Sequence, residues 1–242
     1  MKFHGKLTIL LGLVPLTALA SGTPPTAAPP QPFTATYKVL RKGSPLGVST
    51  LTLKKQTDGT WVYRSSLKAE HGLAALLGGH LDESSHFRLH DGRIESLGYD
   101  YDLHASLASK QRRVRVDWRA GTVSVHTGDD GDFSYKPKPG LVERHLLVLA
   151  LGRAVAEGKT EIALPVAVKD RVQIQTFVVR GRENITVPAG QFDAIHIART
   201  HDDKGYSVWF APKRFGNVPV KLHQQAGGDI TMLLKSVQAN AP

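Results

Sequence analysis

The sequence contains no cysteine among its 242 residues, so it can form no disulfide, no iron–sulfur cluster and no thiolate zinc site. A thiol nucleophile is excluded for the same reason. The sequence also lacks the motifs G-x-S-x-G, H-E-x-x-H and G-x-G-x-x-G, which are typical of α/β-hydrolases, zinc proteases and dinucleotide-binding enzymes. We therefore expect no catalytic residue, no metal ligand and no cofactor-binding residue of these common kinds.

Three patterns approach a known site without matching one. The stretch Gly152–Thr160 has five residues between its glycines, where a phosphate-binding P-loop has four, and it closes a predicted helix instead of opening one. His86 and His90 fall on a predicted strand, where they would lie roughly 13 Å apart, too far to bind one metal ion. The aspartates around Gly131 lack the alternating ligands and the distal glutamate of a calcium loop. None of the three predicts a cofactor or a metal ion.

The first 20 residues predict a cleavable export signal. Lys2 and Lys6 form a positively charged region before an apolar run, Leu7–Leu16, which is too short to cross a bilayer as a helix. The segment ends in Thr17–Ala20, a small-x-small pattern that signal peptidase recognises. We expect cleavage after Ala20 and a periplasmic protein that is not integral to the membrane.

The rest of the chain divides into three parts by composition. Residues 21–32 are rich in proline and alanine and predict a leader without a hydrophobic core. Residues 33–237 carry continuous strand-like patterning and predict one β-barrel-like domain, and residues 238–242 form a short tail.

The formal net charge of the chain is +10, with 31 Lys and Arg against 21 Asp and Glu. Such a balance favours anionic partners, and after export these would be lipid headgroups or acidic envelope polymers, not nucleic acid. The basic residues are spread along the chain, so they also fit the solvated face of a sheet.

Most of the chain alternates between apolar and polar residues with a period of two. Trp61 and Tyr63 share one face of a predicted strand, and Val114, Val116 and Trp118 share one face of another. Glycine-containing turns separate such segments, which is typical of antiparallel sheets. We predict an all-β domain of roughly 12 to 14 mainly antiparallel strands, as a single curved sheet or an open or closed β-barrel.

One segment departs from this pattern. Residues 141–157 have apolar residues at helical intervals, and Gly158 follows where a helix would end. The segment is mostly apolar, so we predict one α-helix at about 141–157, packed against the inner face or the mouth of the sheet.

A second apolar segment, residues 71–81, combines leucines with three glycines. Exposed apolar side chains on a mobile backbone are costly unless they meet a core or a ligand. The segment is therefore either a plug of the barrel or a gate to a ligand. The candidate gate residues are Leu73, Leu76, Leu77 and Leu81.

The C-terminal part contains the most specific sequence motifs. The stretch 187–194 reads V-P-A-G-Q-F-D-A, residues 209–212 read W-F-A-P, and residues 218–221 read V-P-V-K. These stretches resemble the bacterial family catalogued as domain of unknown function 3108, over about 33–237. The resemblance implies an exported envelope protein with no assigned activity. The motif residues, which we expect to specify the fold, are Pro188, Gly190, Phe192, Trp209, Pro212 and Pro219; we expect Trp118 to be a core residue as well.

Three functions remain open from the sequence. The first is a noncatalytic periplasmic envelope protein that binds or carries a lipid-like or amphipathic anionic envelope component, because curved sheets with apolar interiors are usual places for such ligands. The second is a structural or assembly protein that binds an envelope protein or polymer, and the third is an enzyme of unrecognised type.

Overall fold

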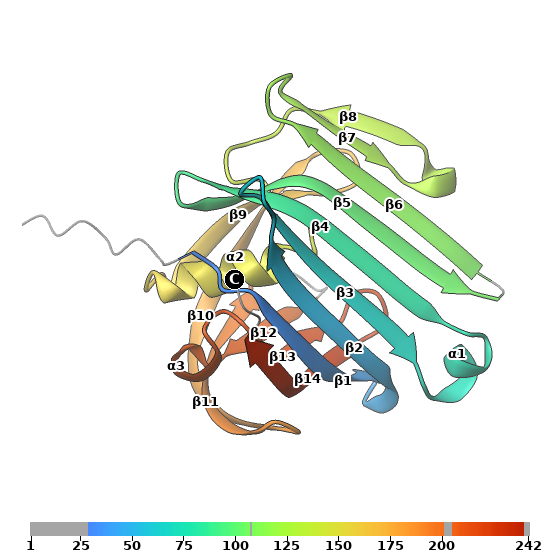
Figure 1. Ribbon diagram of the computed structural model, residues 1–242, viewed down its shortest axis with the longest axis vertical. Helices are drawn as coiled ribbons and strands as arrows, with labels where there is room; N and C mark the ends of the chain where they lie inside the picture. The colour runs from blue at the N-terminus through green and yellow to red at the C-terminus, as the bar shows by residue number, and fades with distance from the viewer. Residues whose placement is uncertain (1–28, 107, 201–204, 240–242) are drawn as a thin grey trace, which may run out of the picture.

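The computed structural model describes residues 29–106, 108–200 and 205–239; the predicted export signal lies outside these ranges. Fourteen strands form one antiparallel sheet that curves strongly and stays open (Figure 1), which confirms the predicted fold class. The strands are Phe33–Arg41 (β1), Ser44–Lys55 (β2), Trp61–Ala69 (β3), His80–His90 (β4), Arg93–Ala105 (β5), Ala108–Asp117 (β6), Thr122–His126 (β7), Asp132–Tyr135 (β8), Glu161–Ala167 (β9), Val172–Val187 (β10), Gly190–Arg199 (β11), Tyr206–Phe210 (β12), Pro219–Gln224 (β13) and Ile230–Ala239 (β14).

The sheet consists of two meanders, in which each strand pairs with the next strand along the chain. The first meander is β1–β8 and the second is β9–β14. They join where β1 pairs with β14, with Phe33 opposite Ala239 and Arg41 opposite Ile230. The first and last strands of the domain therefore lie side by side in the middle of the sheet.

The predicted alternation decides which side chains face inward. On β1, the side chains of Phe33, Ala35, Tyr37 and Val39 are buried, while Lys38 between them is exposed. The largest hydrophobic cluster lies on this inner side and includes the apolar residues of the central helix. A smaller cluster lies under β5–β8.

The chain carries three α-helices and one 3-10 helix in the described ranges. They are Gly72–Leu76 (α1), Leu147–Ala156 (α2), Pro212–Phe215 (α3) and Gly128–Asp130 (η1). α2 lies inside the curve of the sheet (Figure 1), and the residues from Leu147 to Ala154 are all buried. No described helix combines the length and the apolar character that a membrane crossing needs.

The predicted helix over 141–157 exists but begins six residues later, at Leu147. Val142 instead forms an isolated bridge with Val166 of β9. The carboxylate of Glu143 then accepts a hydrogen bond from the backbone N of His145, at 2.7 Å. A side chain that bonds the backbone two residues on competes with helix formation, so the helix starts only after this turn.

Residues 141 and 142 also link distant parts of the sheet. Ser96 of β5 donates a backbone hydrogen bond to Leu141 O at 2.8 Å. Val142 N donates to Pro165 O at 3.0 Å, and Ala167 N donates to Val142 O at 2.8 Å. The connection between the two meanders therefore ties β5 to β9 across the open side of the curve.

Trp209 and Trp118 occupy different environments. Trp209 is only 6% exposed, but it lies on the face of β12 opposite to Tyr206 and Val208 and therefore does not face the central helix. His196 of β11 and Lys221 of β13 lie directly opposite Trp209 and cover it. Trp118 is half-buried beside the smaller cluster, where its Nε1 donates to Ser96 O at 2.9 Å.

Candidate functional site: a cavity between the sheet and α2

The inner face of the sheet encloses a cavity of about 440 Å³. Its walls come from β1–β5 and β12–β14, from α2 and the turn before it, and from the segments that precede β4 and β14. The volume is within the range of roughly 300–1,000 Å³ that is usual for small-molecule sites. The strands form its wall because alternate residues of neighbouring strands point to the same side of the sheet.

Most of the cavity wall is apolar. The aliphatic side chains that line it are Val39, Leu46, Leu51, Leu67, Leu81, Leu103, Val148, Leu222, Ile230 and Met232. Such a surface favours a ligand with a substantial apolar part.

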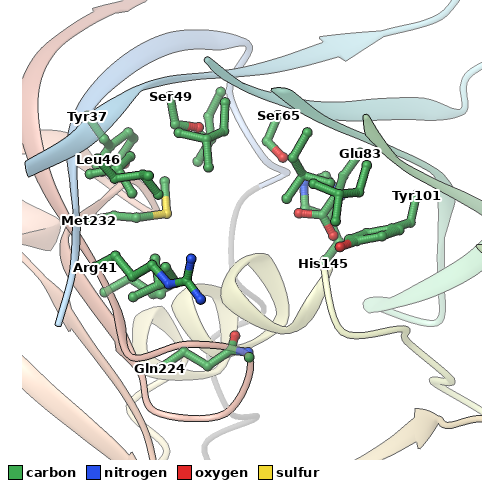
Figure 2. A pocket seen from close by; sticks show the side chains of 18 of the residues that line it. Tyr37, Arg41, Leu46, Ser49, Ser65, Glu83, Tyr101, His145, Gln224 and Met232 are labelled. Atoms are coloured by element: carbon green, nitrogen blue, oxygen red, sulfur yellow. The ribbon is translucent and has the colours of Figure 1, made fainter. Parts of the chain in front are cut away.

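Two groups of polar side chains face each other across the cavity. Figure 2 shows Glu83, Tyr101 and His145 on one side, and Arg41 and Gln224 across the cavity from them. Arg41 is exposed, and within the described ranges no carboxylate lies within ion-pair distance of its guanidinium. The cavity therefore offers two separate polar positions to a ligand.

At the first of these positions, neighbouring side chains hold the carboxylate of Glu83 in place. Tyr99 donates its hydroxyl to Glu83 Oε1 at 2.5 Å, and burial raises the pKa of Tyr99, which keeps the phenol protonated. Arg144 Nε lies 3.9 Å from the same oxygen, and the Arg144 guanidinium lies over the ring of Tyr101, 5.7 Å from its centroid. Glu83 is thus held in place by a neutral donor and a nearby cation.

A second polar group lies behind the cavity wall. Ser85 is fully buried; its hydroxyl donates to Glu143 Oε1 at 2.6 Å and lies 2.8 Å from His145 Nδ1. The imidazole of His145 stacks on Tyr63 with the ring centroids 4.4 Å apart, and it lines the cavity. Because Ser85 does not line the cavity, this contact does not present a serine nucleophile to a ligand.

Burial shifts the pKa values of Glu143 and His145 in opposite directions. Burial raises the pKa of the Glu143 carboxyl to about 7 and lowers the pKa of the His145 imidazole to about 4. At neutral pH the imidazole is therefore uncharged. Neither residue was identified from the sequence, where both fell inside a predicted helix. The available signal was the triplet Glu143-Arg144-His145, three ionisable residues within an otherwise apolar segment.

The four leucines of the candidate gate do not act as one surface. Leu81 lines the cavity, whereas Leu73 and Leu76 are 69% and 85% exposed and Leu77 is half-buried away from the lining. The segment also lines the cavity with His80 and with two small residues, Ala74 and Gly79.

The base of this segment is fixed by hydrogen bonds. Ala69 N donates to Gly79 O at 2.9 Å, and Ser106 N donates to Leu77 O at 2.9 Å. A movement of α1 would therefore leave its two ends in place. The gate itself remains a proposal.

The motif residues of the C-terminal part are distributed over turns and strand ends. Gly190 has a positive φ of 130° in the turn between β10 and β11, Phe192 packs edge-on against Phe215 at 5.1 Å, and Pro212 begins α3. Pro188 and Ala189 form this turn, which Gly190 closes as the first residue of β11, and Trp209 is covered as described above. Pro219 is the motif residue that lines the cavity, and its carbonyl accepts the Tyr37 hydroxyl at 2.8 Å.

In the described ranges, no group of three or more His, Asp or Glu side chains is arranged to hold a metal ion.

The curved, open sheet, the enclosed helix and the apolar cavity define a β-barrel-like protein with a small-molecule-sized interior. The family model "Protein of unknown function (DUF3108)" matches residues 32–235, and the chain belongs to that family.

A solved structure from another family of unknown function shows the same fold at low sequence identity. The β-barrel-like DUF1849 protein from Brucella abortus is 13% identical and aligns with a TM-score of 0.54, over 88% of this chain and 99% of that one. MucB in complex with the periplasmic part of MucA is 13% identical with a TM-score of 0.35, and the MucA/MucB complex of Pseudomonas aeruginosa is 12% identical with a TM-score of 0.32. This chain spans about half of MucB in both, at 51% and 52% of that chain. No curated protein sequence matches this chain.

Proposed function

We propose that this protein is a noncatalytic binding protein of the cell envelope, exported to the periplasm, which takes an amphipathic, lipid-like molecule into its cavity. The observation that carries the proposal is a cavity of about 440 Å³ whose wall is mainly aliphatic and holds a few convergent polar groups. The predicted export signal supports the compartment.

The charge of the cavity supports an anionic group on the ligand. Arg41 lines the cavity, is exposed and has no carboxylate within ion-pair distance in the described ranges. A phosphate or carboxylate of the ligand would therefore find a free guanidinium. The net charge of +10 favours the approach of such a ligand.

The alternative, a protein that holds a partner by adding a strand to its sheet, has less support. A free sheet edge is the surface that such a partner would use. One edge strand, β8, has only four residues, and the free edge of β9 already bonds with Val142 at Pro165 and Ala167. Both edges are thus short or partly covered.

Filling the cavity is expected to abolish binding. Leu67 of β3 lines the cavity, so Leu67→Trp places an indole in the space that a ligand would occupy. We expect the wild-type protein to bind a fluorescent fatty acid saturably and Leu67→Trp to bind it at least about tenfold more weakly. Fluorescence titration measures both affinities.

The matched control is Lys68→Trp, the adjacent exposed residue on the opposite face of the same strand. It adds the same side chain outside the cavity and should bind like the wild type. A wild-type protein that binds no amphiphile, or equal binding by Leu67→Trp, contradicts the proposal.

The gate is tested by two aspartate substitutions. Leu81→Asp puts a carboxylate on the apolar wall and is expected to weaken probe binding by about tenfold, because a charge in an apolar cavity is poorly solvated. Leu76→Asp alters a side chain that is 85% exposed and should leave the fold intact. If the segment is a gate that closes over the ligand, Leu76→Asp also weakens binding; if it is a static cover, binding is unchanged.

A further inference from the structure

One polar atom of the cavity wall has no hydrogen-bond partner. His145 Nε2 is buried and has no donor or acceptor within reach in the described ranges. The ring itself lines the cavity. A buried polar atom without a partner is unfavourable, so a group supplied by a bound molecule would stabilise it.

The buried group behind the wall determines which kind of partner Nε2 needs. When Glu143 is ionised it can only accept, and Ser85 donates its single hydroxyl proton to it at 2.6 Å. The Ser85 oxygen can then only accept from His145 Nδ1, 2.8 Å away, so the proton of the neutral imidazole is on Nδ1. Above the Glu143 pKa of about 7, where its carboxyl is ionised, Nε2 is left as a bare acceptor.

Glu83 provides a second hydrogen-bond acceptor on the same side of the cavity as His145. Its Oε1 receives the Tyr99 hydroxyl, whereas its Oε2 accepts no hydrogen bond from the described part of the chain. Glu83, Tyr101 and His145 lie together on one side of the cavity (Figure 2). This side of the cavity therefore holds one acceptor on Glu83 and a second, buried acceptor on His145.

The charges nearby decide between the two kinds of donor that a ligand could bring. An ammonium group would be attracted by Glu83, but Arg144 and Arg41 also line the cavity and would repel it. A hydroxyl group donates hydrogen bonds without carrying a charge. The site thus fits a hydroxyl better than an amine.

We propose that Glu83 and His145 form a subsite for the hydroxyl groups of a polyol or sugar head group, with the acyl chain of the ligand along the aliphatic wall and Arg41 free to bind an anionic group of the same ligand. Ser85 and Glu143 act as positioning residues, because they fix the imidazole with Nε2 as an acceptor. The inference rests on the proposed function, namely that the cavity binds an amphiphile.

The test compares two probes with the same acyl chain. Monooleoylglycerol carries two free hydroxyls, and methyl oleate carries none. We expect the wild-type protein to bind monooleoylglycerol about tenfold more tightly than methyl oleate, as measured by displacement of a fluorescent fatty acid. Equal affinities for the two probes would overturn the inference but leave the proposed function standing, and binding of neither probe nor fatty acid would overturn the proposed function itself.

Two variants test the named residues. His145→Phe keeps a ring for Tyr63 to stack on but removes the acceptor, so the preference for monooleoylglycerol should fall to about twofold or less while the affinity for methyl oleate is unchanged. Ser85→Ala leaves the imidazole in place but removes the hydrogen bond that fixes its proton on Nδ1. It should therefore also reduce the preference for monooleoylglycerol. If the two residues have a purely structural role, each variant should lose affinity for both probes by the same factor. That result in both variants contradicts the proposal, and so does an unchanged preference for monooleoylglycerol in both variants.

Discussion

Replacing Trp209 with alanine is expected to lower the free energy of unfolding by about 3–4 kcal/mol, near the value for a buried tryptophan. The ring is 6% exposed and stacks on His196 with the ring centroids 4.3 Å apart. The Lys221 ammonium lies 4.3 Å from the indole centroid on the neighbouring strand, and Nε1 donates to Glu183 Oε2 at 3.0 Å. Alanine removes all of these contacts together.

Urea unfolding measures the loss as a lower midpoint with an unchanged slope. Trp209→Phe serves as the control, because it keeps most of the stacking and loses mainly the hydrogen bond to Glu183; about 1 kcal/mol is expected. Because Trp209 lies on the face away from the cavity, both variants should bind a fluorescent fatty acid like the wild type. A loss below about 1 kcal/mol for the alanine variant would show that its neighbours do not bury the ring in solution.

Removing one member of the Glu143–His145 pair is expected to make the free energy of unfolding depend strongly on pH, whereas in the wild type the two contributions largely cancel. The folded protein holds a proton on Glu143 up to a pKa of about 7, above the ordinary value of 4.5, so this residue lowers the stability as the pH rises from 4.5 to 7. The folded protein keeps His145 neutral down to a pKa of about 4, below the ordinary 6.5, so this residue raises the stability as the pH rises from 4 to 6.5. Over the shared window the two contributions oppose each other.

Glu143→Gln removes the first contribution and keeps the shape of the side chain. Relative to the wild type, its stability should therefore rise by roughly 3 kcal/mol between pH 4.5 and 7. His145→Gln should show the opposite trend relative to the wild type, falling by a similar amount between pH 4 and 6.5.

Urea midpoints at intervals of half a pH unit follow the two differences. Subtracting the wild-type curve removes the contributions of the other titrating carboxylates to the stability, because all three proteins share those carboxylates. Parallel curves for the wild type and both variants would show that the buried pair does not titrate as its burial implies.

The alternation of apolar and polar residues was sufficient to predict the fold class. In β1, for example, every second side chain from Phe33 to Val39 is buried. The start of α2 could not be predicted, because Val142 is held by a bridge to Val166, a residue far along the chain. The position of Trp209 escaped prediction for a related reason: its neighbours are polar side chains of adjacent strands, which make a buried site on the face expected to be exposed.

The candidate site was predicted only in outline. The apolar character of the cavity follows from the strands, and of the four gate leucines Leu81 lines it. The polar groups Glu83 and His145 meet only because β4 and the turn before α2 approach each other in space. No spacing in the sequence encodes that approach, since Ser85 and His145 are 60 residues apart.

The seam between β1 and β14 sets the order in which the protein can fold. Thr36 and Ser236, which hydrogen-bond across this seam, are 200 residues apart, whereas the other strand pairs join neighbours along the chain. Contacts of such long range form late, because the loop that they close is entropically costly. Each meander can begin to form from local hairpins, but the inner edge of β1 has no partner until β14 arrives. Until β14 pairs with it, β1 has one unpaired edge, so folding must outpace aggregation at this edge.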